Sequence, residues 1–262
     1  MTAANLDIGV TKTRVRIRFN KLGKIRWTSH RDVARMWERA FRRERLPLAY
    51  SGGFSPRPKV SFGLALPTGY ESVAEFIDVE LVDFPQADVA ALPALLSAAL
   101  PEGVDATDAE EIPPSVPSLQ EEVTSCSWRW RVEAPEERLG PKPAEVEARV
   151  AACLFASELV VTRPRKGIEQ SDDIRPGILD LRLAAPGDSG DDGTIWIEAE
   201  LACRPRAIRP SDVTLALGGD VEERDVRRTH QWIWRDGARQ EPLVKAAPGP
   251  AIGARHALER AS

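Results

Sequence analysis

The chain has 262 residues, of which 42% are hydrophobic and 29% are charged, a composition that predicts a globular protein with a sizeable buried core. No stretch approaches the roughly 18 continuous apolar residues of a membrane span, and residues 1–10 lack the apolar run of a signal peptide, so a cytoplasmic protein is expected. Cys126, Cys153 and Cys203 are widely separated and only three histidines are present. This pattern argues against a conventional zinc or iron–sulfur site, and no cofactor is expected.

Positive charge is concentrated near the N-terminus. The net charge is −4, yet residues 11–60 hold fifteen lysines and arginines against three acidic residues, so this window carries +12 and the remainder of the chain −16. The fifteen are Lys12, Arg14, Arg16, Arg18, Lys21, Lys24, Arg26, Arg31, Arg35, Arg39, Arg42, Arg43, Arg45, Arg57 and Lys59. Such asymmetry predicts a surface that faces a polyanion. The alternative, a face that only keeps the protein soluble, would normally mix both signs.

The first part of the chain carries strand and helix patterns in alternation. Strict alternation over Thr13–Phe19 predicts a half-buried strand. A helix is expected to begin after Ser29, with Asp32 three residues later as in a capping box, and to end at Pro47. Strand, strand, helix and strand patterns follow at residues 59–66, 74–82, 86–100 and 104–111, with the helix interrupted by Pro93. The order β-α-β-β-α-β predicts a ferredoxin-like domain, with a four-stranded sheet and both helices on one face.

The second part is expected to repeat this order after a proline-rich linker. The predicted organisation is a disordered N-terminus (1–10), a basic ferredoxin-like domain (11–112), a linker (113–120), a second ferredoxin-like domain (121–235) and a disordered tail (236–262). The fold class is therefore α+β with tandem ferredoxin-like units. Strands are expected at residues 122–133, 159–162 continued at 178–183, 194–203 and 225–234, and helices at 142–157 and 211–217, the latter capped by Ser211. Trp128, Trp130, Trp232 and Trp234 are expected to pack the second core.

Four segments carry a resemblance to a known family. They are Gly23–His30 (GKIRWTSH), Arg39–Arg43 (RAFRR), Tyr50–Pro58 (YSGGFSPRP) and Ser61–Gly69 (SFGLALPTG). They resemble the radical-SAM-linked family, bacterial proteins found alone or fused behind a radical S-adenosylmethionine domain. The resemblance is dense from Arg14 to Leu81. It implies association with a radical enzyme acting on RNA, but supplies no catalytic residues. Because the chain lacks the CxxxCxxC motif of such enzymes, it is expected to be a substrate-binding companion. The architecture also resembles, more distantly, the RAMP proteins of CRISPR systems.

A glycine-containing loop is the first candidate site. Two glycines let the backbone approach an anion closely, hydroxyls and cations add donors, and an aromatic ring is available to stack on a base. The candidate residues are Ser51, Gly52, Gly53, Phe54, Ser55, Arg57 and Lys59. The alternative is a rigid connector with Phe54 buried.

The first helix is the second candidate. Arg31, Arg35, Arg39 and Arg42 share one face and are expected to contact phosphates, unless that face is only solvated. His30, at the start of the helix, is included in the nucleic-acid surface. As a catalyst it lacks an evident second acid–base group, so no catalytic residue is assigned.

Two further basic segments differ in their expected roles. Arg163, Arg165 and Lys166 are expected to extend the basic surface from the second domain. By contrast, the arginines of the first strand are expected to face Asp78 and Glu80 across the sheet, and cross-strand ion pairs would consume much of their charge.

The sequence therefore predicts a non-catalytic, RNA-binding accessory protein that presents tRNA or rRNA to a radical S-adenosylmethionine enzyme. One alternative is a metal-independent ribonuclease using His30. Another is a protein-interaction module that docks the radical enzyme.

Overall fold

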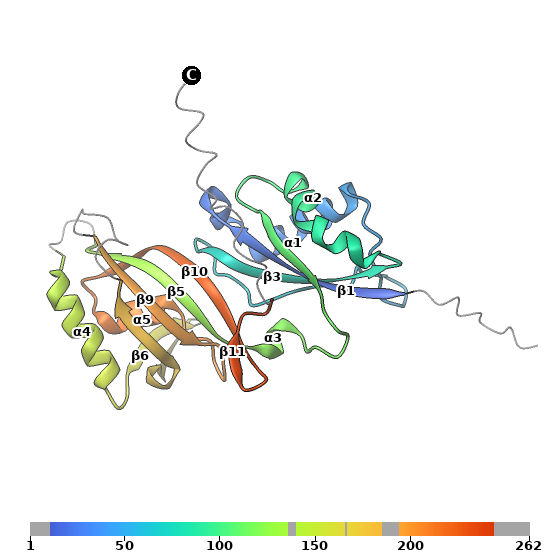
Figure 1. Ribbon diagram of the computed structural model, residues 1–262. Coiled ribbons are helices and arrows are strands. Elements are labelled where there is room, and N and C mark those ends of the chain that lie inside the picture. Colours follow the sequence, from blue (N-terminus) through green and yellow to red (C-terminus); the bar gives the residue numbers. More distant parts are fainter. Residues whose placement is uncertain (1–10, 136–139, 166, 185–193, 244–262) are drawn as a thin grey trace, which may run out of the picture.

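The computed structural model describes residues 11–135, 140–165, 167–184 and 194–243. Within them the chain forms a mixed α+β structure built on a large, mostly antiparallel sheet with few helices (Figure 1). The sheet strands are β1 (Lys12–Lys21), β2 (Val60–Phe62), β3 (Glu71–Val82), β4 (Ala106–Glu111), β5 (Val123–Glu133), β8 (Ile178–Leu183), β9 (Ile195–Ala202), β10 (Glu222–Arg235) and β11 (Ala238–Gln240). The α-helices are α1 (His30–Arg43), α2 (Leu92–Ala99), α3 (Leu119–Glu122), α4 (Pro143–Phe155) and α5 (Pro210–Leu217). The expected α+β class is confirmed.

The strands follow the order β4-β1-β3-β10-β5-β9-β8. β2 pairs with the C-terminal half of β3, and β11 pairs with the end of β10. The first half of the sheet therefore runs β4-β1-β3-β2, and the second half runs β10-β5-β9-β8. The halves meet where β3 and β10 pair in parallel at Glu71–Arg227 and Ser72–Arg228.

Two helices cover one face of the first half. α1 and α2 lie on the same side of β1 and β3 (Figure 1), and Trp37 and Phe41 of α1 are buried in the core with Ile17 and Ile77. The predicted cap of α1 is confirmed, because the Ser29 hydroxyl accepts a hydrogen bond from the Asp32 N–H at 3.2 Å.

Pro93 lies in the first turn of a helix rather than interrupting one. A 3-10 helix spans Gln86–Ala91, and Pro93 lies in the first turn of α2. Proline is accommodated there because an N–H in the first turn has no carbonyl partner within the helix, so its absence costs no hydrogen bond.

The opposite face of the first half is covered as well. α3 lies on that side of the sheet (Figure 1), and Leu119 packs with Leu243, Ala74 and Phe76 in a small buried cluster. α3 thus begins inside the expected linker, residues 113–120. The chain also stays ordered beyond residue 236, where a disordered tail was expected, because β11 pairs with β10 and Leu243 is buried. Residues 1–10 and 244–262 lie outside the described part.

The second half has its own core, with α4 and α5 packed on the sheet. β6 (Val160–Arg165) and β7 (Ile168–Asp173) form a separate hairpin. The expectation that residues 159–162 and 178–183 belong to one strand is therefore wrong. The predicted cap of α5 is also wrong: the helix begins at Pro210 after Arg209, whose N–H is bound by Asp212.

The tryptophans of the second half separate into two kinds. Trp128 and Trp130 are buried as predicted, Trp232 is half-buried, and Trp234 is 66% exposed. The expectation that Trp234 packs the core is wrong. Among the helices in the described ranges, none has both the length and the apolar character needed to cross a bilayer.

Candidate nucleic-acid interface

Seven of the fifteen N-terminal cations are ion-paired or buried. Six form ion pairs: Arg14 and Arg16 with Asp78, Arg18 with Glu241, Arg26 with Glu71 and Asp225, Arg35 with Asp32, and Lys59 with Glu80. Lys21 is buried, and burial lowers the pKa of its ammonium group. Cross-strand pairing with Asp78 is thus confirmed for Arg14 and Arg16, whereas Arg18 pairs with Glu241 and Glu80 pairs with Lys59.

The other eight cations are exposed and form no ion pair with any residue that the structure describes. They are Lys12, Lys24, Arg31, Arg39, Arg42, Arg43, Arg45 and Arg57. Four of them belong to α1, and Arg45 follows directly after it. The free positive charge is therefore concentrated on the solvent side of α1, opposite the stripe that packs on the sheet.

The glycine-containing loop projects from the edge of the sheet as a closed turn. Tyr50 and Pro58 form an isolated bridge, and the Ser51 N–H donates to the Arg57 carbonyl at 2.9 Å. The Arg57 N–H donates in return to Ser51 Oγ at 3.1 Å. Gly53 has φ +105°, a conformation that L-residues with a side chain rarely adopt.

The tip of this loop is open to solvent. Gly52, Gly53, Phe54 and Ser55 are all exposed, and Phe54 is fully so. The alternative of a connector with Phe54 buried is therefore wrong. Arg57 carries an unpaired charge close to this ring in the sequence, whereas the Lys59 ammonium lies 2.8 Å from Glu80 Oε2.

His30 lies at the start of α1 with its ring exposed. Its ring centroid is 5.2 Å from that of Phe62 at the end of β2, in an edge-to-face contact. A hydrogen bond of 2.8 Å from the Gly69 N–H to the Arg26 carbonyl brings the same two segments together again. Two segments that carry the family resemblance, Gly23–His30 and Ser61–Gly69, thus lie side by side.

Trp27 is an exposed residue that the expected site does not include. It ends the 3-10 helix Gly23–Trp27 and is 64% exposed. Its position in one of the resembling segments, three residues before His30, is a sequence signal that could have identified it.

The second-half basic segment does not add free charge where it is described. Arg163 pairs with both Asp172 and Asp212, so its guanidinium is neutralised. The side chain of Arg165 and all of Lys166 lie outside the described residues.

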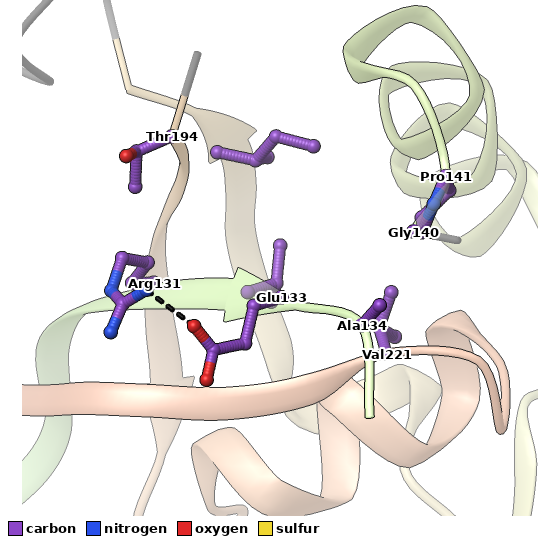
Figure 2. A pocket seen from close by; sticks show the side chains of 9 residues that line it. Arg131, Glu133, Ala134, Gly140, Pro141, Thr194 and Val221 are labelled. Carbon is purple, nitrogen blue, oxygen red and sulfur yellow. Dashed lines mark hydrogen bonds and ion pairs between the residues drawn. The ribbon is translucent and has the colours of Figure 1, made fainter. Parts of the chain in front are cut away.

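A pocket of about 270 Å³ opens at the end of β5, between Arg131, Glu133, Pro141, Thr194 and Val221 (Figure 2). The Arg131 guanidinium pairs with Glu133 and with Asp225, so the pocket offers no free cation from this residue. None of the residues expected to bind nucleic acid lines it.

These features define an α+β protein with a large mixed sheet and an exposed basic helix. The chain belongs to the family described as "Uncharacterized protein conserved in bacteria (DUF2344)", which matches residues 14–210. No curated protein matches the chain. One solved structure with similarity is titled "Crystal Structure of a Cbf5-Nop10-Gar1 Complex"; it is 11% identical, with a TM-score of 0.44, and the match covers 83% of this chain and 48% of that chain. The protein thus spans about half the length of that chain.

Proposed function

We propose that this protein is a non-catalytic RNA-binding accessory protein, and that α1 and the loop Tyr50–Pro58 form its RNA-binding surface. The protein would hold tRNA or rRNA for a radical S-adenosylmethionine enzyme in the bacterial cytoplasm. Guanidinium groups suit this role because they stay charged and donate in a fork to phosphate oxygens.

One observation carries the proposal. Arg31, Arg39, Arg42 and Arg43 of α1 are exposed and have no ion-pair partner among the described residues. The protein is acidic overall, so carboxylates are plentiful, and several of them neutralise other cations of the same window. Charge left free on one helix supports a polyanionic ligand that the protein itself does not supply.

The fold proposal is that the sheet consists of two fused ferredoxin-like units. The strand orders β4-β1-β3-β2 and β10-β5-β9-β8 support it, since each is the same order within a β-α-β-β-α-β unit. In the second unit the hairpin β6–β7 is an insertion between α4 and β8.

The partnership with a radical enzyme rests on the family resemblance of the segments between Arg14 and Leu81. A ribonuclease using His30 is not favoured, because the His30 ring packs against Phe62 rather than against a second acid–base group. If the basic face instead docked a protein, the protein would not bind RNA. The binding experiment below distinguishes these two functions.

The test is binding of bulk tRNA and of a ribosomal RNA fragment at about 50 and 200 mM salt. Affinity should fall steeply with salt, because each bound phosphate releases counterions. Replacing Arg39 and Arg42 together by alanine should weaken binding to both RNAs, and it should reduce the salt slope by roughly one for each phosphate that the variant no longer binds.

Arg182→Ala is the matched control. Arg182 is 60% exposed, but it lies on β8 and already pairs with Asp180 and Glu198, so its replacement should leave the slope unchanged. Equal effects of the two replacements, or no RNA binding by the intact protein, would overturn the proposal. Co-purification of a radical enzyme without RNA would support the protein-docking module instead.

A further inference from the structure

Trp27 is held rigidly in its exposed position. The carbonyl of Arg26, the residue before it, accepts hydrogen bonds from the Gly69 N–H at 2.8 Å and from Lys21 Nζ at 3.2 Å. Lys21 Nζ also donates to the carbonyl of Thr28, the residue after it, at 3.0 Å. The backbone on both sides of the tryptophan is thereby anchored to the buried end of β1.

The indole lies directly on a glycine. Gly69 has φ +91°, and a Cβ at this position would lie 2.9 Å from Cζ3 of Trp27. Only a residue without a side chain lets the ring approach so closely. With 64% of the residue still exposed, the rest of the ring faces solvent. A ring fixed in this way gives up little conformational entropy when a partner stacks on it.

Basic residues border the ring. The Arg26 guanidinium carbon lies 5.4 Å from the ring centroid, although Arg26 also pairs with Glu71 at 3.8 Å and with Asp225 at 3.6 Å. Lys24 and Arg31, three and four residues away along the chain, are exposed and are two of the eight cations that form no ion pair within the described residues. An aromatic surface flanked by cations matches the two parts of a nucleotide, a flat base and a phosphate.

We propose that Trp27 stacks on an unpaired nucleobase of the bound RNA. This proposal rests on the proposed RNA-binding function and makes it narrower: the ligand must present at least one unstacked base next to the phosphates that α1 binds. A fully paired duplex would satisfy the arginines but not the indole, because its bases are stacked on one another.

The experiment compares a fluorescently labelled single-stranded RNA with the same sequence in a blunt duplex. Trp27→Ala should weaken single-strand binding by roughly 5- to 150-fold, the range expected when one base is no longer stacked, and should change duplex binding little. Trp27→Phe should retain most of the affinity. Binding of single-stranded RNA should also quench tryptophan fluorescence, and this quenching should shrink in Trp27→Phe.

Trp234→Ala is the matched control, because Trp234 is 66% exposed on β10 and its replacement should leave both affinities unchanged. Two results would contradict the stacking proposal while leaving the proposed function intact. In one, RNA binds and Trp27→Ala lowers the affinities for single-stranded and duplex RNA equally; in the other, RNA binds and Trp27→Ala changes neither affinity. If Trp27→Ala instead released a bound protein partner and left RNA binding intact, Trp27 would contact protein and the stacking proposal would be overturned. If the unmodified protein binds neither RNA, both proposals fail.

Discussion

The guanidinium of Arg16 is completely buried and donates to both carboxylate oxygens of Asp78, at 2.7 and 3.0 Å. The two residues face each other across β1 and β3. A third hydrogen bond, of 3.0 Å, runs from the guanidinium to Glu122, just after the expected linker. Arg16 therefore links β1 and β3 to α3, which covers this face of the sheet, and the charges of Arg16 and Asp78 are withdrawn from the surface.

Removing one partner of this pair should destabilise the fold strongly. Arg16→Met leaves the buried Asp78 with fewer donors, and the unfolding free energy should fall by about 3 kcal/mol, since breaking a buried pair strands a charge. Urea denaturation measures it. Arg182→Met, at an exposed ion pair on β8, should cost less than about 1 kcal/mol. Similar decreases for both variants would contradict the buried-pair account.

Paired and unpaired arginines should differ in their effect on RNA binding. Arg18 pairs with Glu241 and donates to the Val73 carbonyl, whereas Arg39 is exposed and unpaired within the described residues. Arg39→Gln should lower affinity for bulk tRNA severalfold, and Arg18→Gln should leave it unchanged at a temperature where the variant is folded. Filter binding measures the affinities, and circular dichroism checks that each variant is folded. A larger loss of affinity in Arg18→Gln than in Arg39→Gln would place the RNA-binding surface elsewhere.

The contact between Trp27 and Gly69 should be sensitive to a single methyl group. Gly69→Ala places a Cβ against the indole at a positive φ, and the expected destabilisation is about 1–3 kcal/mol. In a Trp27→Ala background the steric part disappears, so the same replacement should cost less. Thermal denaturation of the four proteins gives the coupling. Additive effects would show that the ring does not lie on the glycine.

Stability should decline at alkaline pH because of Tyr70. Its hydroxyl donates to Glu223 Oε1 at 2.5 Å, and burial raises the pKa of the phenol. Above about pH 10 the unfolded chain loses this proton while the folded protein retains it, so unfolding becomes easier as pH rises. Tyr70→Phe should be less stable at pH 8, because Glu223 loses its donor, yet show a shallower decline towards pH 11. Parallel curves from urea titrations would contradict this.

The two neighbouring thiols should react in a fixed order. Sγ of Cys126 and Sγ of Cys203 lie 3.5 Å apart. The hydrogen bond from Cys126 lowers the pKa of Cys203, whereas burial raises the pKa of Cys126. Because the thiolate is the reactive form, iodoacetamide should alkylate Cys203 first. Mass spectrometry of peptides from partly labelled protein measures the order, and Cys126→Ala, which removes the donor, should slow the labelling of Cys203.

The local residue pattern was sufficient to predict a helix or strand wherever the structure depends on residues close together in the sequence. The alternation in Thr13–Phe19 predicted β1, and Ser29 followed by Asp32 predicted the cap of α1, because both depend on residues a few positions apart. The same reasoning failed at residues 159–183. A turn at Gly167 folds β6 back onto β7, and nothing in the apolar pattern of that segment marked the hairpin as separate from β8.

By itself the sequence determined the α+β class, most of the strands and helices, and the +12 window, because periodicity and composition are local properties. Only the tertiary structure decided which of those cations remain free. The pairing of Arg16 with Asp78 was predicted from the strand pattern, but the further carboxylates that neutralise Arg16 and Arg18 are those of Glu122 and Glu241, far away along the chain. It also decided that Trp37 is buried while Trp27 is exposed, since burial depends on what the folded chain packs against a side chain.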